Sequence, residues 1–271
     1  MRLHIMGSAA AEGWPAMWCD CPSCHKAHQA GGKNYRTRSG ALIDGVIKVD
    51  LCPDTYMQAR RDDVDLSKVT DLLITHAHQD HFTPAELGFH VPPFAHGATP
   101  LHVWAALQAI MLARAATQRW PDVENRLHVL TPLAPVRLSD GITEVLPLPA
   151  RHDRHSGPLN YIITRNGKSL FYGLDSGWYP DESWEAQKGN KFAIVVLDCT
   201  HGDMEASDGH GSLGTAKRIK EEMLAAGTAD HNTVFIANHF SHNGGLLHEE
   251  MEDIVRSAGI LVGYDGMIVE V

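Results

Sequence analysis

Runs of apolar residues predict strands along the whole chain. Three uninterrupted runs are typical of strands buried on both faces, at 72–74, 192–197 and 233–237. Shorter runs predict further strands, at 3–6, 101–104, 127–130 and 143–146. The turn dipeptides Asp44-Gly45 and Asn166-Gly167 predict two hairpins, over 41–50 and 161–172. The last strand follows an Asp265-Gly266 turn within 263–271.

Apolar residues at helical spacing predict helices between these strands, at 53–61, 105–120, 212–226 and 249–258. A further helix is expected to start at Thr83-Pro84, which supplies a capping residue and a proline at the first helical position. The segments 7–18 and 91–100 are expected to be loops, the second of them over the functional site. No Pro- or Ser-rich linker separates the two halves, so we predict an α/β protein with a single domain over residues 1–271.

Composition and charge narrow the class of protein. The chain has 271 residues, 44% of them hydrophobic, which is ordinary for a globular protein. Its formal charge of −10 argues against a long nucleic acid as partner, although a local basic pocket for one phosphate is allowed. The apolar stretch 103–116 is too short and too interrupted for a membrane span, and the first seven residues lack a signal-peptide core. We expect a cytoplasmic protein without membrane contacts.

The strongest chemical signal is Thr75-His76-Ala77-His78-Gln79-Asp80-His81, directly after the predicted strand 72–74. His76 and His78 project to one side of an extended loop, and Asp80 and His81 can turn back toward a second point. Imidazole and carboxylate are ligands that suit zinc, manganese or iron. The spacing therefore predicts two adjacent metal positions. The alternative, a polar loop in a chain with 18 histidines, is disfavoured by four ligand-type residues at this spacing.

A second cluster lies near the N-terminus, in Cys19-Asp20-Cys21-Pro22-Ser23-Cys24. Three thiolates at this spacing can converge on one tetrahedral zinc, with a fourth ligand from elsewhere in the chain. A redox-active or incidental cysteine cluster is the alternative. Cys52 and Cys199 lie beside apolar runs and are expected to be buried thiols.

Candidate ligands in the second half follow predicted strands. Each is by itself also typical of a hydrogen-bonded residue at the rim of a sheet. They are His152 after 143–146, Asp175 after 169–172, Asp198 and His201 at the end of 192–198, and His239 and His242 after 233–237.

The HxHxDH pattern at 76–81 resembles the signature of the metallo-β-lactamase superfamily, and the start of the chain resembles two of its branches. Gly7-Ser8-Ala9-Ala10, Trp14-Pro15 and the CxCxxC cluster are similar to the N-termini of PhnP-type phosphodiesterases and PqqB proteins. The resemblance implies a four-layer αββα sandwich with a dinuclear metal site at the sheet edge. It also identifies 91–120 as an insertion relative to PhnP.

The same resemblance assigns ligands. It implies that His76, His78 and His152 hold one metal, that Asp80, His81 and His239 hold the other, and that Asp175 bridges them. It gives Asp80 a catalytic role as well, and it places His242 with Cys19, Cys21 and Cys24 around a structural zinc. His210 matches a loop histidine that acts as general acid, with an exposed loop residue as the alternative.

A dinuclear centre holds water as a nucleophile, and the chain shows no serine with an evident base. The favoured prediction is therefore a metal-dependent hydrolase of a small phosphodiester, possible substrates including cyclic nucleotide or ribose esters. The cofactors would be two divalent metals (zinc or manganese, with iron as a third option) and one structural zinc. Alternatives are a hydrolase of esters, lactones or thioesters, a PqqB-like role in cofactor biosynthesis, a tRNA-processing nuclease, and a zinc-stabilised binding module without turnover. A homodimer is left open.

Overall fold

The computed structural model describes residues 1–206 and 208–271 and contains two seven-stranded sheets packed face to face. In the order of its hydrogen-bonded neighbours, the first sheet contains β14 (Met267–Glu270), β1 (Arg2–Gly7), β2 (Gly40–Ile43), β3 (Ile47–Val49), β4 (Asp71–Leu73), β5 (His102–Ala105) and β6 (Leu127–Val129). The second contains β13 (Ile260–Val262), β12 (Val234–Asn238), β11 (Phe192–Asp198), β10 (Lys168–Gly173), β9 (Leu159–Arg165), β8 (Glu144–Pro149) and β7 (Val136–Arg137). Both sheets mix parallel and antiparallel pairs. In the first sheet β3–β4 is parallel and β1–β2 antiparallel, and in the second β10–β11 is parallel and β9–β10 antiparallel.

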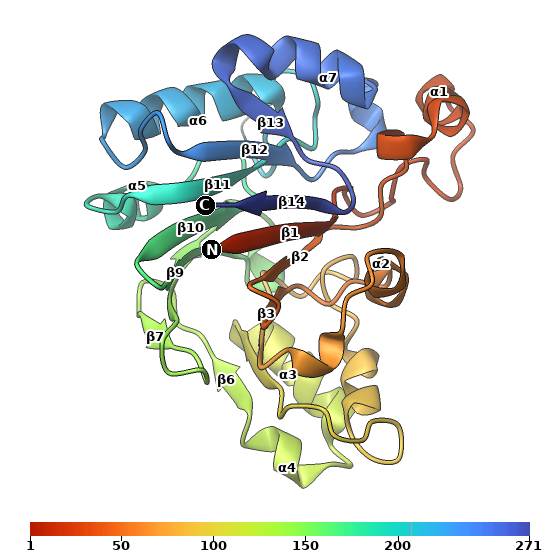
Figure 1. Cartoon of the computed structure of the whole chain (residues 1–271), viewed down its shortest axis with the longest axis vertical. Helices are drawn as coiled ribbons and strands as arrows, with labels where there is room; N and C mark the ends of the chain where they lie inside the picture. The colour runs from red at the N-terminus through yellow and green to blue at the C-terminus, as the bar shows by residue number, and fades with distance from the viewer. Residues whose placement is uncertain (207) are drawn as a thin grey trace.

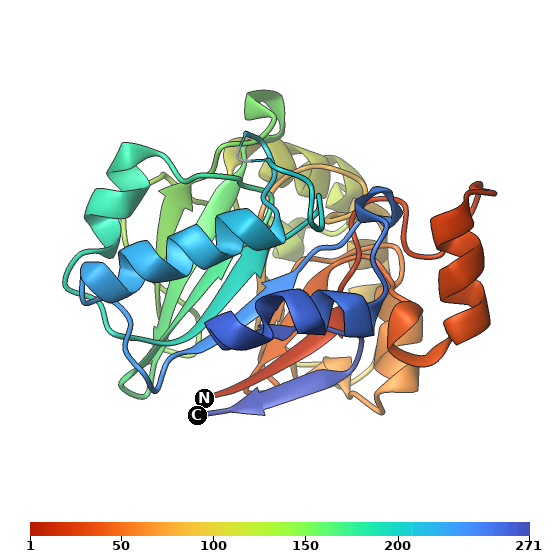
Figure 2. The ribbon, with the colours of Figure 1, turned by 90° about the horizontal axis from the view of Figure 1, so that it is seen from above.

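Helices cover the outer face of each sheet (Figures 1 and 2). Those beside the first sheet are α2 (Thr55–Arg61), α3 (Leu107–Thr117) and α4 (Pro121–Glu124), and those beside the second are α5 (Asp181–Gln187), α6 (Leu213–Ala225) and α7 (His248–Val255). A further helix, α1 (Pro22–Ala30), stands apart beside the N-terminal loop. The predicted αββα sandwich is confirmed. In the described part of the chain, no helix has the length and apolar character needed to span a membrane.

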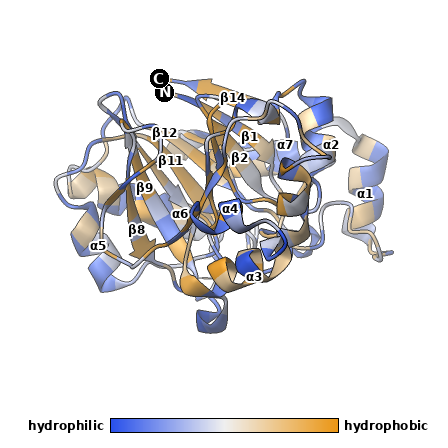
Figure 3. Cartoon of the chain, turned by 90° about the horizontal axis from the view of Figure 1, so that it is seen from below, coloured by the Kyte–Doolittle hydropathy of each residue, from blue (hydrophilic) through white to orange (hydrophobic). Residues whose placement is uncertain are grey.

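The core follows from the alternation of side chains along the strands. Leu3 and Ile5 of β1 face inward and pack with Tyr172 of β10 and Val196 of β11 between the sheets. Figure 3 shows this hydrophobic strand layer flanked by helices of mixed hydropathy, and α3 exposes Leu107, Met111 and Leu112. Ile219 of α6 belongs to a separate core on the outer face of the second sheet. The uninterrupted apolar strands β11 and β12 are buried on both faces for this reason, as the sequence predicts.

A buried carboxylate ties the two sheets together at the edge remote from the metal loop. Asp71, at the start of β4, is fully buried and accepts hydrogen bonds from Trp104 Nε1 (2.8 Å) and from the backbone and hydroxyl of Ser139 (3.0 and 2.7 Å). Thr70 Oγ1 donates a further bond at 2.7 Å. Because each oxygen is satisfied, the charge is tolerated in the core and fixes the start of β4.

Several predicted elements differ from the observed ones. The helix expected at Thr83-Pro84 is a 3₁₀ segment, Pro84–His90, and the Thr83 side chain does not cap it. The helix expected over 105–120 ends at Thr117, because Pro121 starts the separate helix α4. The loop 91–100 was expected over the functional site. Its end instead lies beside Ser67, whose carbonyl accepts from Thr99 N (3.0 Å), at the edge of the sheet opposite the metal loop.

Candidate metal centre

Seven of the predicted ligands come together at one edge of the sandwich, from loops of both sheets. His76, His78, Asp80 and His81 follow β4 of the first sheet, while His152, Asp175 and His239 follow β8, β10 and β12 of the second. Their ligand atoms form three overlapping groups in which all atoms lie within 4.8 Å of one another: His76, His78 and His152; Asp80, His81 and His239; and His76, His81 and Asp175. A fourth such group joins Asp175 and His239 to Asp198 and His210.

The first group is a triangle of imidazole nitrogens. His78 Nδ1 lies 3.0 Å from His76 Nε2 and 3.2 Å from His152 Nε2. A ring nitrogen that carries a hydrogen can donate it to only one of the other two nitrogens. Three converging nitrogens therefore leave lone pairs that face a common point. Burial, together with the neighbouring imidazoles, lowers the pKa of His76 well below its usual value and lowers that of His152. Both are held neutral, the form that binds metal.

The second group surrounds His81 with carboxylates. Asp80 Oδ2 and Asp175 Oδ2 each lie 3.2 Å from His81 Nε2, which is itself 3.2 Å from His239 Nε2. Burial opposes a charge on His81, yet the carboxylates of Asp175 and Asp50 outweigh it and raise its pKa well above the usual value. This position therefore attracts a cation.

Asp175 lies between the two groups. Its Oδ2 is 3.2 Å from His81 Nε2 and 3.3 Å from His239 Nε2, and its Oδ1 is 3.8 Å from His152 Nε2. Although this Oδ2 is buried, no donor among the described residues is aligned to form a hydrogen bond with it. A buried carboxylate oxygen surrounded by imidazole nitrogens fits a divalent metal. Asp175 and His239 both have left-handed backbones, with φ of 51° and 64°, so each ligand stands on a sharp turn after its strand.

Supporting residues behind the ligands fix their tautomers. Asp50, fully buried after β3, accepts from His81 Nδ1 (2.7 Å), Thr75 N (2.8 Å) and Thr75 Oγ1 (2.9 Å). His81 therefore turns Nε2 toward the centre of the group. Thr200 Oγ1 lies 2.7 Å from His239 Nδ1 and orients that ring in the same way. The sequence gives no local sign of Asp50, because the histidine that it holds is 31 residues away.

Asp198, one of the strand-end candidates, supports the site and lies outside the seven assigned ligands. It is buried and accepts from the backbone N–H groups of Asp175 (3.0 Å), Thr200 (3.0 Å) and Gly211 (2.9 Å). Its Oδ2 also lies 3.1 Å from His210 Nδ1. His201, the neighbouring candidate, belongs to none of the ligand groups found among the described residues.

His210 lies beside the centre with about a quarter of its side chain exposed. Its ring is 4.8 Å from that of His152 and stacks on that of His239 at 5.6 Å. Burial disfavours its charged form, but the hydrogen bond and charge of Asp198 outweigh burial and raise the pKa of His210 to about 9. Because Asp198 accepts from Nδ1, the Nε2–H group of His210 is free of this carboxylate.

The cysteine cluster closes around a histidine from the far end of the chain. The ligand atoms of Cys19, Cys21, Cys24 and His242 all lie within 4.8 Å of one another, and His242 Nδ1 is 3.6 Å from Cys19 Sγ and 3.4 Å from Cys21 Sγ. Four such donors suit a closed zinc site.

Local structure places these thiols. Cys21 is the N-cap of α1, with Pro22 in its first turn, and its sulfur accepts from Cys24 N at 3.4 Å. That backbone bond, with His242, lowers the pKa of Cys21 to about 6. On the other side of the cluster, Glu12 Oε1 lies 3.5 Å from His242 Nε2 and accepts from the Ser241 hydroxyl. The helix α1 was not predicted.

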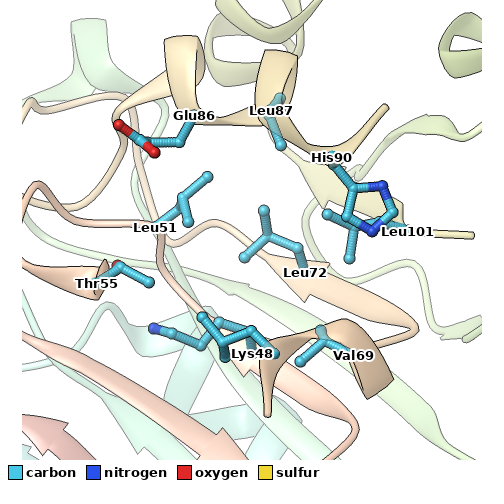
Figure 4. A pocket seen from close by; sticks show the side chains of 10 residues that line it. Lys48, Leu51, Thr55, Val69, Leu72, Glu86, Leu87, His90 and Leu101 are labelled. Carbon is cyan, nitrogen blue, oxygen red and sulfur yellow. The ribbon is translucent and has the colours of Figure 1, made fainter. Parts of the chain in front are cut away.

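A separate apolar cavity of about 120 Å³ lies outside this centre, between β3, β4 and the 3₁₀ segment (Figure 4). Leu51, Leu72 and Leu87 are among its mainly aliphatic lining, which offers water few partners. Lys48 lies at its edge, but its amine donates to Val49 O (3.0 Å) and Asp50 O (2.6 Å). Glu86 and His90 also line the cavity, but no group of three potential metal ligands is found there among the described residues.

An αββα sandwich with clustered His and Asp donors at its edge is the arrangement of a metal-binding protein of the metallo-β-lactamase class. The model of the beta-lactamase superfamily domain matches residues 46–240. The chain belongs to this superfamily.

Individual relatives are more distant. Coenzyme PQQ synthesis protein B of Acinetobacter baumannii (strain ACICU) is 24% identical over 321 residues, and the match covers 100% of both chains. Among solved structures, a diphosphatase from the PhnP family has a TM-score of 0.72 at 23% identity, covering 100% of this chain and 97% of that one. Zinc-bound PqqB from Methylobacterium extorquens has a TM-score of 0.71 at 17% identity, covering 100% of both chains. The structural likenesses establish the fold alone.

Proposed function

We propose that this chain is a hydrolase with two catalytic metals that cleaves a small phosphodiester. The observation that carries the proposal is the position of Asp175, whose two oxygens face ligands of both groups at 3.2–3.8 Å. A carboxylate placed in this way is suited to bridge two cations. When bound, such a pair of metals acidifies a shared water and offsets charge on the phosphoryl oxygens. Zinc, manganese and iron all suit the donor set.

The residues around the metals divide the remaining work. Asp50 and Thr200 keep His81 and His239 in the tautomer that turns Nε2 toward the centre. Asp80 is a ligand of the second group, and we assign it the further role of orienting the attacking water. Asp198 holds His210 protonated beside the centre, with Nε2–H available as a donor.

These positions support the following proposed reaction. Water adds to phosphorus and releases one proton to solvent, the bond from phosphorus to the leaving oxygen breaks, and His210 gives its proton to that oxygen as general acid and is reprotonated from solvent. The second product is a phosphomonoester. The PhnP-family neighbour, described as a diphosphatase, supports phosphoryl chemistry in this fold.

The test combines metal content with turnover. We expect close to three metals per chain, counting the cysteine site, and hydrolysis of bis(4-nitrophenyl) phosphate in preference to a lactone or a thioester. His78→Ala should lose at least about 100-fold in kcat/KM, since it removes a ligand. His231→Ala is the matched control, because His231 is exposed before β12, at the end of that strand remote from His239. Hydrolysis of only the lactone or the thioester would show that the substrate is not a phosphodiester. A protein that binds one metal and cleaves none of the substrates would refute the proposal.

A role like that of PqqB is the second candidate, because the curated relatives that match along the whole chain carry that name. It predicts metal binding without hydrolysis of any of the three test substrates. The complete ligand set and His210 favour the hydrolase.

A further inference from the structure

A pocket of about 450 Å³ lies beside the metal loop, and the proposed reaction does not use it. Its walls come from the start of α3, the segment after β6, and the connection from β8 to β9. They are mainly apolar, with Leu107, Pro132 and Pro158 among them, and Gln108 and Thr131 add polar groups. A pocket of this size with apolar walls and few polar groups is typical of a small-molecule site.

Backbone hydrogen bonds join the wall of this pocket to the metal loop. Leu159, which lines the pocket, donates from its N–H to Thr75 O at 2.9 Å. Ala77 N donates to Ser156 O at 3.0 Å. Because these contacts lie on both sides of His76, the pocket and the first group of ligands share one rigid edge.

The short 3₁₀ turn Arg154–Ser156 and the residue before it place charged side chains at this edge. It begins after Asp153, whose carboxylate lies 3.2 Å from His78 Nε2 and accepts from His155 N at 3.0 Å. The acid of the turn is therefore engaged with a metal ligand. Arg154 is the one charged side chain among the described residues that line the pocket.

Arg154 has no acidic partner within 4.0 Å in the described part of the chain, and the same holds for Arg151. Some other exposed arginines are paired, Arg114 with Glu124 (2.6 Å) and Arg137 with Glu144 (2.6 Å), whereas Arg60 and Arg119 are exposed and also have no acidic partner within 4.0 Å in the described part of the chain. Two unpaired guanidinium groups thus flank the ligand His152 in a chain of net charge −10. Guanidinium is suited to bind phosphate or carboxylate through two parallel hydrogen bonds.

We propose that this pocket binds one organic group of the substrate, and that Arg154 recognises a second anionic group on it, a phosphate or a carboxylate. The proposal rests on the phosphodiesterase function and names its substrate class. The apolar walls would hold a ring or a short chain, the diester phosphate would face the metals, and the second anion would reach Arg154. A neutral lactone or thioester would leave Arg154 without a partner.

The experiment measures discrimination on matched substrates. Thymidine 5′-(4-nitrophenyl phosphate) is prepared with a free 3′-hydroxyl, a 3′-phosphate or a 3′-O-carboxymethyl group, and kcat/KM is measured for each. For the wild-type protein we expect an at least tenfold preference for one anionic substrate over the free hydroxyl, and which anion is preferred distinguishes phosphate from carboxylate. Arg154→Ala should bring the ratio close to one, and Arg154→Lys should retain part of it. Arg137→Ala, which removes an exposed arginine from strand β7 outside the pocket, should leave the ratio unchanged.

Two results would overturn the proposal: a wild-type ratio near one, or a preference that persists in Arg154→Ala. A binding measurement separates this failure from failure of the proposed function. If no diester is cleaved, calorimetry on the metal-loaded protein compares thymidine 3′,5′-bisphosphate with thymidine 5′-monophosphate. If the bisphosphate binds tenfold more tightly than the monophosphate, and Arg154→Ala loses this preference, the anion site is supported and the proposed reaction is refuted. Equal affinities would reject the site.

Discussion

Asp50 offers the clearest test of how the protein holds its metals. The proposed change is Asp50→Asn, which replaces one carboxylate oxygen by an amide of nearly equal size. Asp50 has a left-handed backbone with φ of 60°, a conformation that asparagine also tolerates. The amide oxygen can keep the bond from Thr75 N at 2.8 Å. The substitution therefore isolates the 2.7 Å contact with His81 Nδ1.

The expected magnitude follows from that contact. An amide N–H facing His81 Nδ1 favours the tautomer that carries its proton on Nε2, the nitrogen that lies among Asp80, Asp175 and His239. The ring must then return to the other tautomer to bind metal. Loss of a partner of this kind costs about 10- to 100-fold in metal affinity or activity, or about 1.4–2.8 kcal/mol.

The assay is competition for zinc with a chromophoric chelator, read together with kcat/KM on bis(4-nitrophenyl) phosphate. Asp44→Asn is the matched control. Asp44 has φ of 49° and lies in the turn between β2 and β3, where it accepts from Arg2 N (2.7 Å) and Arg165 Nε (3.0 Å), away from the metals. If Asp50→Asn bound the metal of the second group within twofold of the wild-type affinity, the tautomer argument would be wrong.

Three further predictions concern the scaffold. Cys24→Ser should lose one metal per chain and unfold at a temperature lower by ~5–10 °C, because metal a hundredfold above its Kd stabilises the folded protein by ~2.7 kcal/mol. Cys52→Ser, the control, should keep the metal count. Atomic spectroscopy measures the metal content and calorimetry measures the unfolding temperature. Asp71→Ala should lower the free energy of unfolding by ~2–4 kcal/mol, because it leaves a buried indole N–H and a hydroxyl unpaired, while the exposed Asp122→Ala should change it by less than ~0.5 kcal/mol in urea titrations; equal effects would contradict this. Burial alone would raise the pKa of Asp140, but hydrogen bonds from the residues after it outweigh this and lower it, so its stabilisation is present above the unfolded pKa near 4 and is lost as pH falls through the folded value. Asp140→Asn should therefore cost about 1–2 kcal/mol at pH 7, and the difference from wild type should shrink below pH 4, whereas a pH-independent cost would exclude the linkage.

The sequence was sufficient for features with a local signal. The HxHxDH spacing indicates a metal loop because its four donors fall within six residues after a buried strand. The apolar runs of β11 and β12 likewise identify central strands. The strand-end histidines and aspartate could be assigned to particular metals only through the family resemblance, since their convergence depends on the order of strands in the second sheet. The described geometry agrees with that assignment, which stays a prediction until metals are measured.

Features with long-range causes escaped prediction. Nothing near Asp50 or Thr200 indicates that these side chains hold His81 and His239, because these partners lie 31 and 39 residues away. The helix α1 was missed because its first turn is the cysteine cluster, where the cap is an unusual residue, Cys21. The single-domain organisation, the cytoplasmic location and the small phosphodiester substrate stay predictions.

The division of the ligands between the two sheets bears on how a newly made chain acquires its metals. His76 and His239, which serve neighbouring positions, are separated by 163 residues and lie on loops of opposite sheets. Neither group of candidate ligands is assembled before the sheets have met, so a metal held by these residues would bind the folded protein and not the nascent chain. Mass action then pulls the folding equilibrium toward the native state, by about 2.7 kcal/mol for each site at metal concentrations a hundredfold above Kd. Where metal is scarce the sandwich would open more often along its sheet interface, and proteolysis of the open form would set the lifetime of the protein.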